Sequence, residues 1–410
     1  MKRLPAIRRR SRIGGSLLVI LAIFAIGFAA GNLSQSNTDA QERAAVSETE
    51  RAFEPFWDAF SIIESRYVEP VEVDELVDGA IRGMVEVLGD AHSGYIRPEL
   101  CQSSRNFSGK FSGIGVTIKT DEETGGIEVL TVIPNTPADE VGLLPGDIFY
   151  EVDGKRVSGL SQAELSALVP GPRGTTVTIV FKRGAEFITF EIVRDTFEMP
   201  NVSYEIVGDS IARISMLDFH DLSRSQLEEA FDAIDIDNTN GLIFDIRNNP
   251  GGTLASAIEI GSAFIEDGVL LRQVARDHTE EITRASGGYL DIAVPIVVLV
   301  DETSASASEV IAGAMQDHGV ATIIGETTFG KGTVQNLPDL SNGGCLRITV
   351  RRWLTPKGHW IHKQGIRPDI IVEWDPNEHS GDTGEDPQLA AAIEYLESLR
   401  DQNAVAAYNP

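Results

Sequence analysis

Two short stretches carry residues whose types and spacing could do chemistry: TSASASE, residues 303–309, and GETTFGKGTVQ, residues 325–335. Ser306 lies at the expected turn between a buried strand and a helix, where its Oγ would sit beside the positive end of the helix dipole. A serine hydroxyl at such a turn is a candidate nucleophile, but it needs a base to take its proton. The stretch also fits a simple capping box, because Ser306 and Glu309 satisfy S-x-x-E. Both interpretations are open at this point.

The glycine-rich stretch around Lys331 has a nucleotide interpretation that its context disfavours. Gly325, Gly330 and Lys331 fit the first seven positions of GxxxxGK[ST], the loop that binds nucleotide phosphates. The eighth position is Gly332, which lacks the hydroxyl that would bind Mg²⁺. The residues that follow include a proline and a glycine pair, so they do not predict the helix whose N-terminus faces the phosphates. We therefore expect no nucleotide site.

Lys331 is a better candidate for the base that Ser306 needs. The strand ATIIG, 321–325, is expected to return beside the strand VPIVVLV, 294–300, in a right-handed crossover that brings the lysine toward the serine. A lysine acts as a base only when it is neutral, and burial can lower its pKa from about 10.4 to between ~5 and ~7. Flanking glycines would let the chain bury the amine, and the carbonyl oxygen of Gln335 could hold it.

The histidines are poorer candidates for a base or a metal ligand. His318 follows the same helix as Ser306, at a distance of about 18 Å of helix rise. His359 and His362 form HxxH in an expected turn region without an acidic ligand nearby. The sequence therefore predicts no metal site and no cofactor.

Composition limits the remaining function classes. The chain has 410 residues and a net charge of −28, and its 42% hydrophobic residues are typical of globular proteins. This length allows two or three domains. An acidic body repels nucleic acid and anionic lipid, so we expect no nucleic-acid partner.

The first 31 residues predict a membrane anchor. A basic segment, 1–12, precedes the uncharged apolar segment 13–31, which is close to the ~20 residues that span a bilayer. This order predicts a cytoplasmic N-terminus and a body outside the inner or plasma membrane. The alternative is a cleaved signal sequence and a secreted protein. In either compartment Cys101 and Cys345 could pair or stay free thiols.

The patterns in the rest of the chain predict five regions. These are a linker (32–50), a helical region with a break at Pro70 (51–104), a β-rich module (105–194), an α/β region with buried strands (195–376) and an acidic extension with a short helix (377–410).

The β-rich module resembles a PDZ domain. The resemblance rests on SGIGVTI, 112–118, and on IPNTPADEVGLLPGDIFYEVDG, 133–154. In that family the loop corresponding to Ile114, Gly115 and Val116 presents backbone N–H groups to the terminal carboxylate of a peptide, which adds as an extra strand. The resemblance thus implies a carboxylate-binding site at these three residues. Their side chains depart from the commoner GLGF-type loop, which leaves the preference of the pocket open.

Four motifs extend the resemblance to a whole family. DIRNNPGG, SASASEVIAGAMQD, GETTFGKGTVQ and GIRPDI, in this order and after a PDZ domain, are similar to those of the carboxy-terminal processing peptidases, also called tail-specific proteases. The resemblance covers about residues 53–374. It implies a Ser/Lys endopeptidase with a crotonase-like α/β core, an inserted PDZ domain and no metal or nucleotide.

Carried over by position, the resemblance makes Ser306 the nucleophile, Lys331 the general base and Gln335 its supporting residue. The oxyanion hole would use the backbone N–H groups of Ala307 and of Gly252, with Gly251 as the alternative.

The aspartate that ends AMQD, Asp317, has a supporting role in some members, although its distance along the helix argues against direct chemistry. Two residues depart from the family pattern. Thr303 stands where glycine is common and Cys345 where serine or alanine is usual, and neither change removes a catalytic group.

We therefore expect a membrane-tethered serine endopeptidase that recognises the C-terminal tails of extracytoplasmic proteins. A homo-oligomer or a regulatory adaptor would be compatible with the sequence. The competing interpretation is a catalytically weak PDZ scaffold or adaptor at the membrane.

Overall fold

A computed structural model describes residues 48–101, 104, 109–120, 125–374 and 386–408, which divide into two compact units at Met84 and Val85. The segment expected to cross the membrane, 13–31, lies outside these residues. None of the helices within the described ranges combines the length and the hydropathy that a membrane span requires.

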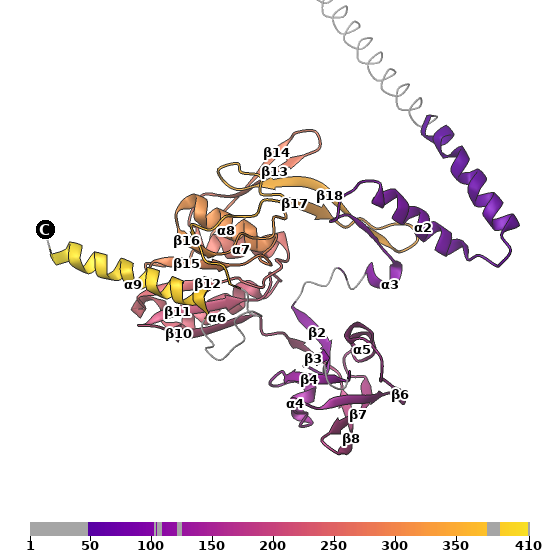
Figure 1. Cartoon of the computed structure of the whole chain (residues 1–410), viewed down its shortest axis with the longest axis horizontal. Coiled ribbons are helices and arrows are strands. Elements are labelled where there is room, and N and C mark those ends of the chain that lie inside the picture. The colour runs from indigo at the N-terminus through magenta and orange to yellow at the C-terminus, as the bar shows by residue number, and fades with distance from the viewer. Residues whose placement is uncertain (1–47, 102–103, 105–108, 121–124, 375–385, 409–410) are drawn as a thin grey trace, which may run out of the picture. The chain divides into compact units, whose positions relative to one another are not determined.

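The first unit is helical, as its apolar spacing predicts. Residues 48–66 form one helix and α2 (Val73–Glu86) a second, which ends just past the unit boundary (Figure 1). Pro70 lies between them, where its ring and missing N–H prevent one continuous helix. Asp74 and Glu75 in the first turn of α2 complement the helix dipole.

The second unit begins with a short strand and a helical turn and then enters the PDZ domain. The main PDZ sheet has the strand order β3-β4-β5-β7-β8, and β6 pairs with β5. A separate two-stranded ribbon of β2 and β9 joins the entry and the exit of the domain. These elements are β1 (Gly94–Ile96), α3 (Pro98–Cys101), β2 (Lys110–Gly113), β3 (Val116–Thr120), β4 (Ile127–Val132), α4 (Pro137–Glu140), β5 (Ile148–Val152), β6 (Lys155–Arg156), α5 (Gln162–Leu168), β7 (Thr176–Arg183), β8 (Glu186–Val193) and β9 (Asp195–Glu198).

The α/β region is built on a six-stranded sheet of order β10-β11-β12-β15-β16-β19, in which all neighbours are parallel except β10 and β11. The expected pairing of the strands in VPIVVLV and ATIIG is confirmed. The elements are β10 (Val202–Val207), β11 (Ile211–Met216), α6 (Ser223–Ile234), the 3₁₀ turn η2 (Ile236–Asn238), β12 (Gly241–Asp245), α7 (Leu254–Phe264), β15 (Ile296–Val300), α8 (Ala307–His318), β16 (Ala321–Gly325), β19 (Ile370–Ile371) and α9 (Pro387–Tyr408).

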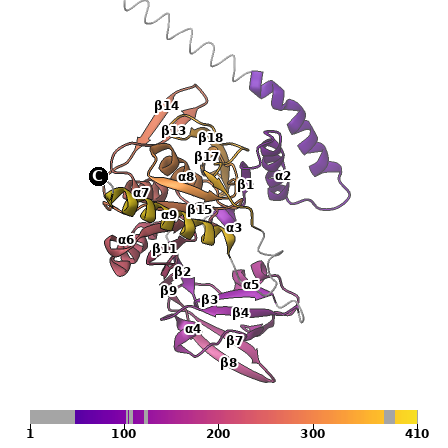
Figure 2. The same cartoon turned by 60° about the vertical axis from the view of Figure 1, so that its left-hand side comes forward.

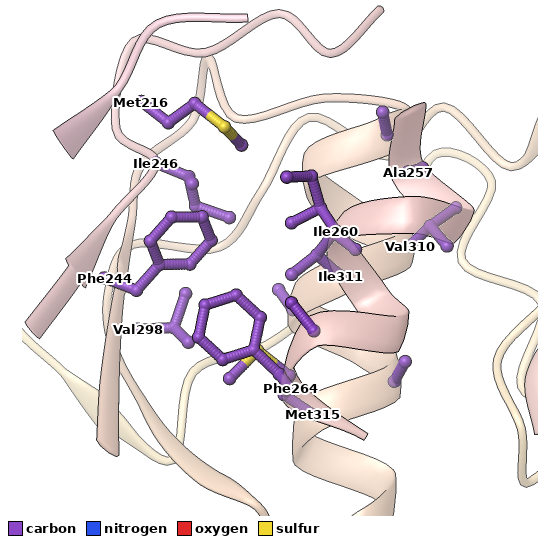
Figure 3. Close-up of a cluster of buried hydrophobic side chains, with 14 of the residues drawn as sticks. Met216, Phe244, Ile246, Ala257, Ile260, Phe264, Val298, Val310, Ile311 and Met315 are labelled. Atoms are coloured by element: carbon purple, nitrogen blue, oxygen red, sulfur yellow. The ribbon is translucent and has the colours of Figure 1, made fainter. Parts of the chain in front are cut away.

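Helices cover both faces of this sheet, which explains why β12 and β15 are apolar without alternation. On one face, Phe244 and Val298 point toward Ile260 of α7 and Ile311 of α8 (Figure 3). The helix α9 covers the other face (Figure 2). Its Ala392 and Leu396 pack against apolar residues of the strands, which are Ile211, Ile243, Val297, Leu299 and Ile324. The strands are thus held rigidly, and their carboxyl ends are fixed in space.

A second sheet carries the lysine segment. Its order is β1-β18-β13-β14, with β17 paired to β18. Cys101 and Cys345 form a disulfide that joins α3 to the start of β18, which settles the question of pairing that the sequence left open. Besides β1, the strands of this sheet are β13 (Val269–Ala275), β14 (Glu280–Arg284), β17 (Thr333–Asn336) and β18 (Cys345–Leu354).

Candidate active site

Ser306 occupies the turn between β15 and α8, as predicted, in an unusual backbone conformation. Its φ of 55° and ψ of −108° lie outside the regions that a residue with a β-carbon prefers, and such strain is commonly held at functional sites. Asp301 holds the turn: its Oδ1 accepts the N–H groups of Thr303 at 3.0 Å and of Ser304 at 2.8 Å. The Thr303 hydroxyl also donates to this carboxylate, so the turn accommodates this departure from the family pattern.

Lys331 lies in the loop between β16 and β17, and its backbone is held on both sides. Trp353 Nε1 donates to the Lys331 carbonyl at 2.8 Å, and Trp360 Nε1 donates to the Gly332 carbonyl at 3.0 Å. A β-carbon on Gly332 would lie 2.7 Å from the backbone nitrogen of His362. Only glycine permits this close approach, which agrees with the expected role of the glycines in enclosing the lysine.

The electrostatic surroundings favour a neutral Lys331 amine. Burial lowers the pKa of the ammonium group, and the positive charge of Arg347 lowers it further, while the Glu309 carboxylate acts in the opposite direction. A depressed pKa raises the fraction of free amine near neutral pH, which is the form that can accept a proton.

Glu309 connects the serine turn to the lysine loop. Its side chain is fully buried, and its Oε2 accepts the backbone N–H of Ser306 at 2.9 Å and that of Lys331 at 2.8 Å. The other oxygen accepts the Thr328 hydroxyl and the Gly330 N–H, both at 2.7 Å. The sequence indicated Glu309 only as a capping residue. Its bonds to the lysine loop, 19 or more residues away, could not be read from S-x-x-E.

Two backbone N–H groups beside Ser306 can form an oxyanion hole. Gly251 N–H donates to Asn249 Oδ1 at 2.9 Å, so it is already used. Within the described ranges no group accepts a hydrogen bond from the Gly252 N–H, and Ala307 is the first residue of α8, where an N–H has no partner inside the helix. Of the two glycines that the sequence left open, the geometry favours Gly252.

The loop that carries these glycines is anchored by a buried arginine. Arg247 donates to both carboxylate oxygens of Asp245, at 2.9 and 2.7 Å, and reaches Asp386 at 2.9 Å. A β-carbon on Gly251 would lie 2.5 Å from the Ala305 carbonyl oxygen, so the loop packs directly against the serine turn. Sequence reasoning treated this stretch as a motif and did not identify the role of its arginine.

The predicted residues meet at one cavity of about 600 Å³. Ser306, Lys331 and Gln335 all line it, as do Gly252 and Ala307. Its walls are otherwise largely apolar, with contributions from Leu254, Leu271, Val310, Val334 and Trp353. A cavity of this size and lining has room for more than one side chain of a bound peptide.

Asp317 lies apart from this cavity, at the far end of α8. Its Oδ2 accepts the backbone N–H of Lys357 at 2.8 Å, and its Oδ1 lies 3.8 Å from the Lys357 ammonium. These contacts engage the carboxylate with Lys357, and Asp317 is not among the residues that line the cavity.

The candidate carboxylate loop of the PDZ domain is fixed from behind. The Ile114 carbonyl accepts the Ala138 N–H at 2.8 Å, and the Gly115 carbonyl accepts the Ile133 N–H at 3.0 Å. Gly115 has a φ of 87°, and a β-carbon there would lie 2.3 Å from the Thr136 side chain. Across the part of the chain that the structure describes, no group accepts from the N–H groups of Ile114 and Gly115. The third predicted residue, Val116, begins β3.

Comparison with known proteins identifies the family. The model of peptidase family S41 matches residues 210–372, that of the PDZ domain 128–183, and that of the activating protease CtpB N-terminal domain 21–99. The carboxy-terminal processing protease CtpA of Bacillus subtilis is 33% identical over 411 residues, which cover 95% of this chain and 87% of the relative. The chain belongs to the carboxy-terminal processing peptidases of family S41.

A second relative and a solved structure are also similar to this chain. The carboxy-terminal-processing protease of Bartonella bacilliformis is 36% identical over 349 residues, covering 83% of this chain and 79% of its own. A solved structure of a candidate S41 protease from Bacteroides fragilis has a TM-score of 0.51 at 16% identity, over 83% of this chain and 96% of that one, and shares the fold. The chain is therefore a serine peptidase of mixed α/β fold with a PDZ domain, and its substrates are proteins.

Glu309→Gln should abolish most of the peptidase activity. The glutamine nitrogen would face N–H donors where the carboxylate now accepts, so the alignment of the serine turn with the lysine loop would be lost. We expect hydrolysis of a peptide substrate to fall ~100-fold or more and the free energy of unfolding to fall by about 1–3 kcal/mol. Glu266→Gln, on an exposed residue after α7, is the control and should change neither quantity. Wild-type activity in Glu309→Gln would contradict this role.

Proposed function

We propose that this peptidase is an endopeptidase that recognises the C-terminal tails of extracytoplasmic proteins through its PDZ domain and cleaves them with a Ser306/Lys331 dyad. The single observation that carries the proposal is the convergence of these two side chains and the free Gly252 and Ala307 N–H groups on one cavity. The buried Glu309 carboxylate supports it, because it holds the backbones of both proposed catalytic residues.

The proposed mechanism has two halves. The neutral Lys331 amine takes the proton of the Ser306 hydroxyl as Oγ attacks the scissile carbonyl carbon. The carbonyl oxygen becomes an oxyanion, which the N–H groups of Gly252 and Ala307 stabilise. Collapse of the tetrahedral intermediate breaks the C–N bond, and the Lys331 ammonium gives its proton to the leaving amine. The Lys331 amine, now neutral again, deprotonates a water molecule that attacks the acyl-enzyme. Collapse of this second intermediate breaks the ester bond, and the Lys331 ammonium returns the proton to Ser306 Oγ.

Ser306→Ala and Lys331→Ala should each abolish cleavage of a peptide substrate without a large change in melting temperature. Lys331→Arg should be equally inactive, because a guanidinium stays protonated. Activity of the wild type should fall as pH decreases through the pKa of Lys331, which burial places below its ordinary value, because protonation removes the base. Lys182→Ala, on an exposed residue of β7, is the control with wild-type rates. Cleavage by either alanine variant at the wild-type rate would disprove the dyad, whereas a wild type that cleaves no faster than Ser306→Ala would favour the scaffold interpretation.

The PDZ domain supplies the proposed selection of tails. The N–H groups of Ile114 and Gly115 lie free at the start of β3, the position from which an extended peptide would continue the sheet. A free carboxylate bound there would select polypeptide ends over internal segments. Binding can also activate the peptidase, provided that the tail binds the active arrangement more tightly than the resting one.

Amidation of a substrate's C-terminus should slow its cleavage strongly, about 10-fold or more in kcat/KM, because the amide lacks the negative charge and one acceptor oxygen. Gly115→Ala should have a similar effect on the free-acid substrate. The control is Gly184→Ala in the β7–β8 turn, which also has a positive φ but open space around its α-carbon. Equal rates for amidated and free tails would assign tail selection to the catalytic cavity instead.

We also propose that segment 13–31 anchors the peptidase in the inner or plasma membrane, with the catalytic body on the outer side. The support is the uncharged apolar stretch after a basic N-terminus. Protease added to spheroplasts should digest the body, and a salt wash should leave the protein in the membrane fraction. A mature N-terminus near Gly31 would show a cleaved signal and a secreted peptidase.

A further inference from the structure

A hydrogen-bond network leads from the segment before the PDZ domain to Gln335. The Gln335 amide nitrogen donates to Thr333 Oγ1 at 2.9 Å and to Thr349 Oγ1 at 3.0 Å. The Thr349 hydroxyl is also one of the groups whose hydrogen bonding lowers the pKa of the Asp90 carboxyl group. Ser93 completes the network, since its hydroxyl donates to Asp90 Oδ2 at 2.6 Å and accepts the Thr349 N–H at 3.1 Å.

The ionised carboxylate gives this network a direction. Partial burial of Asp90 opposes ionisation, but hydrogen bonds from Ser93, Thr349 and the His92 backbone outweigh it and lower the pKa of the carboxyl group to about 2. At neutral pH the carboxylate can only accept hydrogen bonds, so the Thr349 hydroxyl must donate its proton to Asp90. The oxygen lone pairs of Thr349 are then left for a donor, and Gln335 must present its amide nitrogen rather than its carbonyl oxygen.

The second amide proton of Gln335 is used as well, because Thr333 accepts it. The one polar atom left on the side chain is the carbonyl oxygen Oε1, and Gln335 lines the cavity together with Lys331 and Ser306. An amide side chain can be turned over without changing its shape, so only its bonding partners decide which end faces the cavity.

We propose that Asp90, acting through Thr349, is a positioning residue of the peptidase: it fixes the Gln335 amide so that Oε1 accepts a hydrogen bond from the Lys331 amine. The proposal rests on the Ser306/Lys331 mechanism. A neutral amine has two N–H groups and one lone pair, so an N–H held by Oε1 leaves the lone pair to be directed at the Ser306 hydroxyl. If the amide turned over, two N–H dipoles would face each other and the amine would lose this orientation.

The segment that carries Asp90 is attached firmly to the strand that carries Thr349. Strand β1 pairs with β18 from Gly94↔Arg347 to Ile96↔Cys345, and Arg347 Nε donates to the His92 carbonyl at 2.9 Å. The network therefore makes the geometry of the catalytic amine depend on residues that precede the PDZ domain in the sequence.

Thr349→Val tests the proposal, because valine keeps the shape of threonine and replaces the hydroxyl with a methyl group that cannot form hydrogen bonds. We expect kcat to fall about 10-fold or more, within the range that general-base catalysis contributes, while KM changes less than about 2-fold. Thr349→Ser retains the hydroxyl and should restore most of the rate. The matched control is Thr322→Val on β16. This variant also loses one side-chain hydrogen bond, from the Thr322 hydroxyl to the Tyr395 hydroxyl, but neither residue lines the cavity.

The pH profile separates positioning from a general structural defect. Loss of the Oε1 acceptor destabilises the ammonium form, so the acidic limb of kcat/KM, which reports the Lys331 pKa, should move to lower pH in Thr349→Val. The other charged or titratable groups around Lys331 stay in place in this variant; they are Arg347, Glu309, His92 and His362. A structural defect would lower the rate at every pH and leave the limb where it is.

A double-mutant cycle closes the experiment. If Asp90 acts through Thr349, then Asp90→Ala combined with Thr349→Val should be no slower than Thr349→Val alone. The proposal is overturned if Thr349→Val is as active as Thr322→Val, or if Thr349→Ser is as slow as Thr349→Val with an unmoved acidic limb. Activity that persists in the Ser306→Ala variant would instead contradict the dyad itself. Failure of the positioning proposal can therefore be distinguished from failure of the proposed mechanism.

Discussion

The active site depends on the buried carboxylate of Glu309. This one side chain accepts the N–H groups of Ser306, Gly330 and Lys331, which lie on two different loops. One backbone hydrogen bond also joins these loops, from the Phe329 N–H to the Ser304 carbonyl at 3.1 Å. An ionised group in an apolar interior is costly unless its oxygens are fully hydrogen-bonded, and here every bond that satisfies the charge also places a catalytic segment. The hydrogen bonds that stabilise the Glu309 carboxylate are therefore the same bonds that align the Ser306 turn with the Lys331 loop.

The sheet provides the frame on which this interaction can form. Three neighbouring parallel strands end at the same edge, and each is followed by a functional loop: the glycine loop after β12, the serine turn after β15 and the lysine loop after β16. The site thus lies outside the carboxyl ends of a parallel sheet, where ligand sites are common in open α/β folds. Helices on both faces keep the strand ends in register while the loops hold strained conformations.

Local signals were sufficient to predict the α/β core and to single out Ser306 and Lys331, because uninterrupted apolar strands and glycine-bounded motifs can be read directly. The PDZ module and the other residues that meet at the cavity were predicted from the resemblance to a known family. It could not predict the polar groups that position them. Glu309 looked like a helix cap, and Arg247 stood inside a recognised motif. Asp90 and Thr349 are 259 residues apart and carry no local pattern. Partners of this kind are determined by tertiary contact, as the pairing of Cys101 with Cys345 also illustrates.

The disulfide has a topological consequence. It joins residues 244 positions apart, so the PDZ domain, Ser306 and Lys331 all lie on one covalently closed ring of the backbone. A single cut in any loop of that ring would linearise it without separating the two pieces, which would remain one molecule under oxidising conditions. After such a cut, neither piece can diffuse away from the other while the disulfide is intact.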